Sequence, residues 1–152
     1  TQKTNQFNLT TKRYSEPKIR EINSLNNLIF CASVSDKFGD NGITAAGIIL
    51  INDNVAEIDS YMLSCRILGR KAEFAIIKSV LNYLSSQGVT LVKSYYIPSP
   101  KNSQTEKFYD LIGFTSNILP SKTKEYTLKL TKLFTFEDLY TINLNFKKWK
   151  IE

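Results

Sequence analysis

The sequence predicts a single α/β domain in which a mixed, mostly antiparallel sheet is flanked by helices. With 152 residues, 42% of them hydrophobic, the chain is long enough to bury one sizeable core. Alternating apolar residues up to residue 65 predict strands that return on one another. Beyond residue 65 the spacing changes to a helix, a strand, a second helix and a last strand, which places helices on the faces of the sheet.

A short helix opens the fold. Ser15 is a typical N-cap and Pro17 lies in the first turn, so we expect the helix to begin there. The preceding residues, 1–14, are polar, and a faint alternation at Phe7 and Leu9 predicts an edge strand.

Three strands then form a meander. Residues 28–34 alternate, and Asn41-Gly42 is the strongest short-range signal for the hairpin turn. The run ITAAGIILI, 43–51, is apolar on both faces, which is typical of a central strand. After a turn at 52–54, the third strand covers 55–65.

The second half of the chain is predicted to begin with a helix. Apolar residues at helical spacing predict a helix over 68–86, ended by Gly88. Residues 90–98 predict the next strand, 102–114 a short helix ended by Gly113, and 126–130 the last strand.

The chain begins at Thr1 rather than Met, which predicts that residues 1–152 are one domain of a longer protein. Within it, residues 133–152 carry several aromatic side chains and form a C-terminal extension. No apolar run approaches the ~18 residues of a membrane span, and no cleavable leader is evident. We therefore expect a cytoplasmic protein with no membrane partner.

Composition restricts the chemistry. The net charge of +6 permits an anionic partner, but the basic residues form no arginine-rich arm and no RNA-binding motif, so nucleic acid is not expected. Histidine is absent, which removes the commonest general base and metal ligand, and no metal site is expected. Cys31 and Cys65 are too few for a disulfide framework and are expected to be free thiols, with Cys31 structural.

The segment SCRILGRKAE, residues 64–73, places cations directly before the main helix. A helix begins with unpaired N–H groups and a partial positive charge, so cations there are normally unfavourable. An anion is therefore expected: the N–H groups around Gly69 would bind a phosphate with help from Arg66, Arg70 or Lys71. The alternative is that these cations point into solvent and Glu73 partly neutralises them.

The order of elements and these residues resemble the Gcn5-related N-acetyltransferase (GNAT) fold. In that family a Gln/Arg-x-x-Gly-x-Gly/Ala loop cradles the pyrophosphate of coenzyme A, and here the slot holds RILGRK, 66–71. Lys71 occupies the last Gly/Ala position, where a small residue lets the backbone approach phosphate. The segment NSQTEKFYDLIGF resembles the family's Asn…Phe-Tyr…Gly-Phe segment, with matches at Asn102, Phe108, Tyr109, Gly113 and Phe114.

A closer resemblance covers almost the whole chain. The blocks TQKTNQFNLTTKRYS, KFGDNG, IDSYMLSCRILGR and YIPSPKNSQTEKFYDLIGF are similar to the C-terminal part of FkbH-like proteins. Those proteins resemble a fusion of a haloacid-dehalogenase-type (HAD) phosphatase with a GNAT-like domain. They are implicated in loading a glyceryl unit from 1,3-bisphosphoglycerate onto an acyl carrier protein, towards methoxymalonyl units for polyketide synthesis.

This resemblance implies an acyltransferase with no tightly bound cofactor. Its co-substrate would be the phosphopantetheine thioester of a carrier protein, or coenzyme A. Its implied partners are an acyl carrier protein and an upstream HAD-type phosphatase domain. The implied phosphate-binding residues are Arg66, Gly69, Arg70, Lys71 and Asn102.

Cys65 and Tyr109 are the implied catalytic residues. Cys65 precedes the cationic loop, where a helix N-terminus and arginines would stabilise a thiolate that accepts the acyl group. The alternative is a buried strand-end cysteine that acts as a small hydrophobe. Tyr109 matches the tyrosine that GNAT enzymes often use as general acid towards the leaving thiolate, and simple packing is its alternative.

Asp40, Asp59 and Tyr61 are candidates for a substrate pocket. If no bulge intervenes, Asp59 and Tyr61 share a strand face with Cys65. At ~3.3 Å per residue, Asp59 and Cys65 lie about 20 Å apart, too far for direct proton transfer. The simpler alternative for Asp59 is an ion pair with a basic neighbour. The alternative for Asp40 is a structural role, because Asp-Asn-Gly is a typical turn sequence.

Three functions remain open. The leading one is transfer of a glyceryl or similar three-carbon acyl unit to the phosphopantetheine thiol of a carrier protein, together with the HAD-type phosphatase. The alternatives are an acetyl-coenzyme A-dependent N-acetyltransferase and a non-catalytic docking domain for the phosphatase or the carrier protein.

Overall fold

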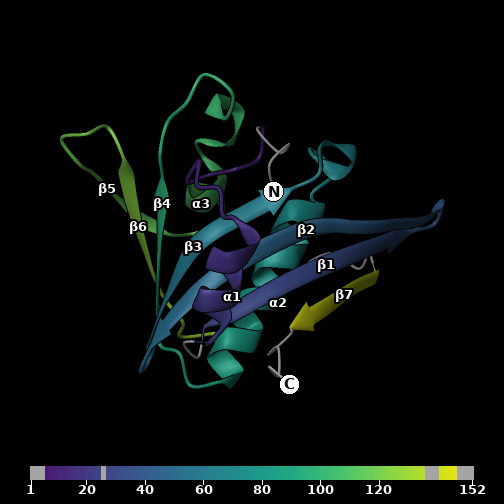
Figure 1. The fold of residues 1–152 in the computed structure, drawn as a ribbon, viewed down its shortest axis with the longest axis horizontal. Coiled ribbons are helices and arrows are strands. Elements are labelled where there is room, and N and C mark those ends of the chain that lie inside the picture. The colour runs from purple at the N-terminus through teal and green to yellow at the C-terminus, as the bar shows by residue number, and fades with distance from the viewer. Residues whose placement is uncertain (1–5, 25–26, 136–140, 147–152) are drawn as a thin grey trace.

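The computed structural model describes residues 6–24, 27–135 and 141–146 and contains one seven-stranded sheet (Figure 1). The strand order is β5-β6-β4-β3-β2-β1-β7, and the β3–β4 pair is parallel whereas the other neighbours are antiparallel. The predicted mixed, mostly antiparallel α/β fold is confirmed. The strands are β1 Leu28–Asp36, β2 Gly39–Asn52, β3 Val55–Leu63, β4 Leu91–Tyr96, β5 Thr115–Ile118, β6 Lys124–Lys129 and β7 Thr141–Phe146.

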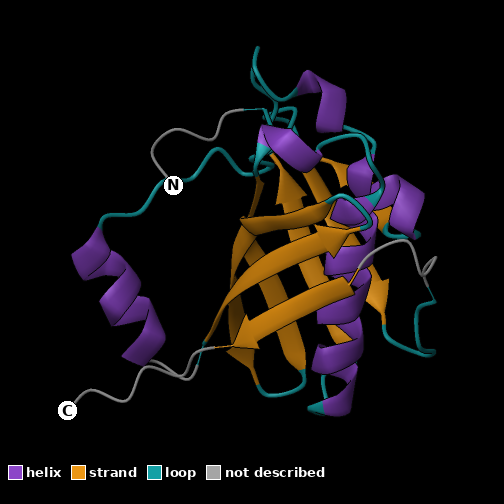
Figure 2. Cartoon of the chain, turned by 90° about the vertical axis from the view of Figure 1, so that its right-hand side faces the viewer, coloured by secondary structure: helices purple, strands orange, loops and turns teal. Residues whose placement is uncertain are grey.

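Helices lie on both sides of this sheet. α1 Glu16–Ser24 is on one side and α2 Ala72–Ser86 packs on the other, as Figure 2 shows. α3 Phe108–Ile112 and the 3-10 turns Cys65–Ile67 and Ser103–Thr105 complete the helical elements of the described residues. None of these helices is both long enough and apolar enough to cross a membrane.

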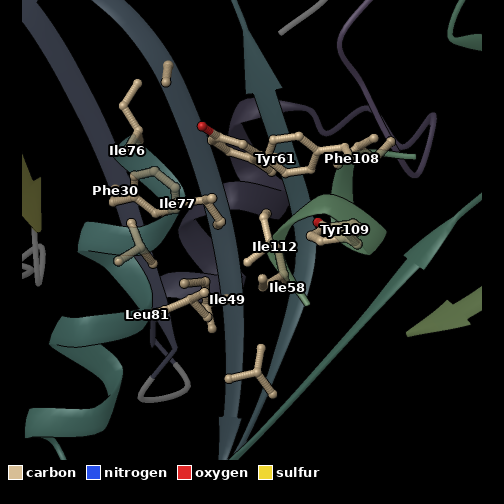
Figure 3. Packing of buried hydrophobic residues seen from close by; sticks show 14 of the residues in the cluster. Phe30, Ile49, Ile58, Tyr61, Ile76, Ile77, Leu81, Phe108, Tyr109 and Ile112 are labelled. Atoms are coloured by element: carbon tan, nitrogen blue, oxygen red, sulfur yellow. The ribbon is translucent and has the colours of Figure 1, made fainter. Parts of the chain in front are cut away.

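The core lies between the sheet and α2 and continues under α3 (Figure 3). Apolar side chains of α2 recur at the spacing that faces them towards one side, as the sequence predicts. The aromatic rings of Tyr61 and Phe108 adjoin in this core, with their centroids 5.7 Å apart. The buried side chains of α2 are Ala72, Glu73, Ala75, Ile76, Ile77, Val80, Leu81 and Leu84.

The hairpin between β1 and β2 does not turn at Asn41-Gly42. Asp36 pairs with Gly39, so the turn lies at Lys37 and Phe38, and the predicted turn is wrong. Gly42 instead sits inside β2 with φ +65°, next to a register shift in the ladder. A left-handed glycine inside a strand is typical of a bulge, and this is why the same dipeptide is compatible with either structure.

The predicted turn at 52–54 is confirmed, because Asn52 pairs with Val55. The strand that follows ends at Leu63 rather than at Cys65. A register shift places Ile48 opposite Ser60 and Ile49 opposite Ile58, which leaves Asp59 as a bulge residue. The shared face of Asp59, Tyr61 and Cys65 was predicted on the condition that no bulge intervenes. That condition fails, because the strand carries a bulge at Asp59 and ends before Cys65.

Other boundaries of helices and strands also differ from the predicted ones. The main helix begins at Ala72 rather than at 68, and Gly88, with φ +87°, follows its end as predicted. Sequence reasoning missed β5 and β7. β7 lies in the C-terminal extension and pairs with β1, so part of 133–152 belongs to the sheet. The aromatic residues Phe136, Tyr140 and Trp149 of that extension lie outside the described residues.

Candidate functional site

Cys65 lies on the surface where the chain leaves β3. It is exposed and opens a 3-10 turn, with the backbone N–H of Arg66 donating to Ser64 Oγ at 3.4 Å. The Ser64 N–H donates to Thr44 O at 2.7 Å, which fixes the start of this turn to β2. The thiol of Cys65 is therefore presented to solvent from an anchored backbone, and the alternative of a buried strand-end cysteine is wrong.

Three exposed cations follow Cys65, and the side chains of two of them contact other residues of the chain. Arg66 Nε donates to Ser64 Oγ at 3.2 Å, and Arg70 pairs with Asp36 at 3.8 Å. Lys71 precedes α2 in the left-handed conformation, with φ +65°. Left-handed backbone is costly for a residue with a Cβ, so this position is one where glycine would be relaxed.

Glu73 supplies the anion at this helix N-terminus. It is 7% exposed, and its carboxylate accepts from the backbone N–H groups of Gly69 and of Glu73 itself. Burial raises the pKa of the carboxyl, and these two N–H groups oppose the rise. Its Oε2 has no hydrogen-bond partner among the described residues. A carboxyl group of the chain itself therefore lies at the N–H groups where an anion was expected.

Glu73→Gln is expected to remove a pH dependence of stability. The pKa of the carboxyl is raised in the folded chain, so its favourable contribution is complete below the ordinary value of 4.5 and is lost as the pH rises through the folded pKa. In denaturant titrations from about pH 4 to 7, the parent should lose stability relative to Glu73→Gln. Glu16→Gln, at an exposed site of α1, is the control. Parallel pH profiles of parent and Glu73→Gln would contradict the prediction.

β3 and β4 separate next to this loop. Their parallel pairing ends at Ile58 and Ser94, although both strands continue. Residues 7–10 lie between the diverging ends. Phe7 O accepts from the N–H of Leu63 at 3.2 Å, and Leu9 O accepts from the N–H of Ile97 at 2.8 Å. Asn8 forms an antiparallel bridge with Met62.

The edge strand predicted for residues 1–14 is therefore wrong. In its described part, the segment crosses the interior of the sheet, and Phe7 and Leu9 are 2% and 0% exposed. Figure 1 shows this N-terminal segment, in purple, passing beside α3 before it reaches α1. The alternation of Phe7 and Leu9 was the available signal, and it indicated burial without indicating the location.

Asn102 holds this segment and is not available to a phosphate. Its side chain is fully buried, and its Nδ2 donates to Asn8 O and to Ile97 O, both at 3.0 Å. Its Oδ1 accepts from the N–H of Ser99 at 2.8 Å and from the hydroxyl of Tyr96 at 3.2 Å. Since both donors and the carbonyl oxygen are engaged, the predicted phosphate contact is not formed by this side chain.

Asp59 anchors the other end of the segment. Its carboxylate, 4% exposed, pairs with Lys12 Nζ through Oδ1 and accepts from the Tyr14 hydroxyl at 2.7 Å through Oδ2. Its backbone carbonyl accepts from Thr10 Oγ1 at 2.9 Å. Burial and the nearby Asp59 carboxylate raise the pKa of Tyr14. The expectation that Asp59 pairs with a basic neighbour is confirmed.

Tyr61 and Tyr109 are core residues in this structure. Tyr61 is 0% exposed and donates to Glu73 O at 2.9 Å, and Tyr109 is 1% exposed. Burial raises the pKa of both phenols, and a hydrogen bond with Ser94 opposes the rise at Tyr109. The Tyr109 ring packs 5.2 Å from that of Phe108, as the packing alternative expects (Figure 3).

Asp40 is an exposed residue near the β1–β2 hairpin. Its Oδ1 accepts from the N–H of Gly42 at 2.8 Å, which closes the bulge described above. This contact matches the local, turn-type alternative for Asp40. Cys31, on β1 opposite Ala46, is half-buried and free, and it lies on a different strand from Cys65.

A shallow pocket of about 240 Å³ opens beside residues 8–13. Asn8 contributes to it and is 2% exposed, and its Oδ1 has no hydrogen-bond partner among the described residues. None of the residues predicted from sequence lines this pocket. In the part of the chain that the structure describes, no group of His, Cys, Asp and Glu is placed to hold a metal ion. The lining residues are Asn8, Thr11, Arg13, Ser99, Pro100 and Lys101.

Comparison with solved structures shows the fold of GNAT acetyltransferases. Ard1 from Thermoplasma volcanium superposes with a TM-score of 0.61 at 14% identity, over 80% of this chain and 84% of Ard1. The ribosomal-protein-S18-alanine N-acetyltransferase from Escherichia coli gives 0.60 at 13% identity, over 88% and 86% of the two chains. PaiA N-acetyltransferase from Thermoplasma acidophilum, solved in complex with coenzyme A, superposes with a TM-score of 0.56 at 17% identity. The match covers 76% of this chain and 80% of PaiA. No protein-family model and no curated protein sequence matches the chain.

Proposed function

We propose that this domain transfers a small acyl group to the phosphopantetheine thiol of an acyl carrier protein, with Cys65 carrying the group between donor and acceptor. The observation that carries this proposal is the exposed thiol at the end of β3, followed by three exposed cations. A thiol on an anchored surface turn can be reached by a large acyl carrier, whereas a buried one cannot.

The proposed transfer consists of two thioester exchanges. The donor in this proposal is an acyl thioester. The Cys65 thiol gives its proton to water, the thiolate attacks the donor's thioester carbonyl, and the donor's C–S bond breaks. The departing thiolate takes a proton from water. The carrier's thiolate then attacks the acyl-Cys65 carbonyl, and Cys65 leaves as a thiolate. Each exchange forms and breaks one C–S bond, so no oxidant or reductant is required.

Charge supports a carrier protein as the partner. The chain has a net charge of +6, and Arg66, Arg70 and Lys71 lie next to Cys65 in the sequence. Carrier proteins are usually acidic, and complementary charge speeds encounter and favours one orientation. A glyceryl or similar three-carbon unit as the acyl group, and a HAD-type phosphatase domain as the upstream partner in a pathway to methoxymalonyl units, rest on the sequence resemblance to FkbH-like proteins.

The proposal predicts a covalent intermediate on Cys65. After mixing with a glyceryl thioester of pantetheine, intact-mass spectrometry should detect a glyceryl adduct that hydroxylamine removes. Peptide mapping should place it on Cys65. Cys65→Ser should lose the adduct completely, and Cys31→Ser, which changes the half-buried thiol of β1, should keep it. An adduct retained in Cys65→Ser would contradict the assignment.

N-acetyl transfer from acetyl-coenzyme A is the second candidate, favoured by the acetyltransferases that share this fold and by the coenzyme A in the PaiA structure. The residues present do not fit coenzyme A well. Glu73 places a carboxylate at the N–H groups expected to bind pyrophosphate, and Lys71 stands where a small residue is expected. Calorimetric titration with coenzyme A separates this candidate from the first.

The third candidate, a docking domain without catalysis, predicts a different result. Cys65→Ser would then leave the turnover of the whole protein unchanged, because the domain would contribute binding surface only. Loss of turnover together with loss of the adduct would exclude it.

A further inference from the structure

We infer that residues 7–10 act as an internal strand that fills the space between the diverging ends of β3 and β4, so that this domain does not bind coenzyme A in that space. The inference does not depend on Cys65 carrying an acyl group. It concerns which ligands the fold admits, and it can fail or hold separately from the proposed function.

The first argument is the backbone pairing of the diverging strands. Where two parallel strands separate, their facing N–H and C=O groups need other partners, because buried unpaired backbone groups are costly. An amide-bearing arm such as pantetheine has the groups to supply such partners. Here the N–H of Leu63, on β3, and the N–H of Ile97, just after β4, both donate to residues 7–10. A ligand arm would have to displace these bonds.

The second argument is burial. Phe7 and Leu9 are 2% and 0% exposed and belong to the main core cluster. The Phe7 ring meets Tyr61 and Phe108 edge to face, with centroids 5.3 Å and 5.0 Å away. A segment that supplies core side chains is not a loosely held loop, because its removal exposes the rings that it covers.

The third argument is that side chains from two other elements hold the segment at both ends. Asn102, before α3, donates to Asn8 O at 3.0 Å. Asp59, the bulge residue of β3, accepts from Thr10 Oγ1 through its carbonyl and pairs with Lys12 through its carboxylate. The bulge exposes a carbonyl and a carboxylate towards residues 10–12, so the distortion of β3 and the position of the segment depend on one another.

A protein group also takes the place of a ligand at the α2 N-terminus, where the Glu73 carboxyl lies at the Gly69 N–H. The chain's own groups thus occupy the strand edges and place a carboxyl group beside the Gly69 N–H of the loop before α2. An acyl group on a carrier protein would then have to be exchanged at the surface, where Cys65 lies.

Amide hydrogen exchange measured by NMR tests the inference on the unmodified chain, alone and with millimolar coenzyme A. The amides of Leu63 and Ile97 should exchange slowly, and coenzyme A should change neither their exchange nor their chemical shifts. Fast exchange without ligand would overturn the internal strand. Binding of coenzyme A that shifts these two amide signals or speeds their exchange would overturn the exclusion, whereas binding that changes neither would place the ligand elsewhere and leave the exclusion standing.

An isosteric variant tests the anchoring without opening the core. Thr10→Val removes the hydroxyl that donates to Asp59 O and keeps the side chain's shape. Loss of one such bond should speed exchange of the Leu63 and Ile97 amides by about fivefold. Thr115→Val, on exposed β5, should leave both unchanged. Equal exchange in the two variants would overturn the anchoring.

Discussion

Phe7→Ala is expected to lower the free energy of unfolding by ~3–5 kcal/mol, the usual cost of removing a buried phenyl ring. Phe7 is 2% exposed, and its ring contacts Tyr61 and Phe108 edge to face. Truncation leaves a cavity between β3 and α3, because the neighbouring side chains come from separate elements and cannot all close on it. The effect should appear in urea denaturation as a lower midpoint with an unchanged slope.

Phe38→Ala is the matched control for this prediction. Phe38 lies in the β1–β2 hairpin turn and is 85% exposed, so its truncation should change stability by less than about 0.5 kcal/mol. If Phe7→Ala were as mild as Phe38→Ala, residues 7–10 would not belong to the core, and the exclusion of coenzyme A would lose its main support.

Asn102→Asp is the second large expected effect, since it keeps the shape of the side chain but replaces its two N–H donors by a carboxylate oxygen and adds an ionisable group. Nδ2 donates to Asn8 O and Ile97 O. In the variant a carboxylate oxygen faces the buried Asn8 carbonyl and the partly buried Ile97 carbonyl. Each carbonyl loses its donor, at a cost of ~1–3 kcal/mol. We therefore expect a loss of ~2–6 kcal/mol at neutral pH by denaturant titration.

The same variant has a predicted pH dependence. Burial and the facing carbonyls raise the pKa of the new carboxyl in the folded chain, so the protonated form is favoured there. Part of the lost stability should therefore return as the pH falls through the folded pKa, because a protonated carboxyl donates to one carbonyl. Asn117→Asp, on exposed β5, should lack this recovery. A loss independent of pH would contradict the assignment of the effect to a carboxylate facing these carbonyls.

The sequence was informative wherever structure is local. Ser15 and Pro17 predict the start of α1, Gly88 and Gly113 the ends of α2 and α3, and residues 52–54 the β2–β3 turn, all as found. Such signals depend on backbone conformations within a few residues, so they need no knowledge of distant partners. Even so, Asn41-Gly42 favours a left-handed backbone that suits a turn and a bulge equally.

The candidate site was harder to predict. The sequence singled out the loop after β3, and in the structure Cys65 and the three cations that follow it are exposed. It did not predict that Asn102 and Asp59 would be buried and would hold the N-terminal segment by hydrogen bonds. Asn and Asp suit both ligand binding and internal hydrogen bonding, and which use prevails depends on the neighbours that the fold supplies.

By itself, the sequence determined the fold class, most of the helices and strands, and a cationic loop before the main helix. Only the tertiary structure decided what fills the space between β3 and β4 and which anion faces the α2 N-terminus. Residues 7–10 reach Leu63 and Ile97 across more than fifty residues of chain, and the bulge at Asp59 fixes which side chains face them. Contacts so distant in sequence arise from the packing of the whole sheet, and no local pattern encodes them.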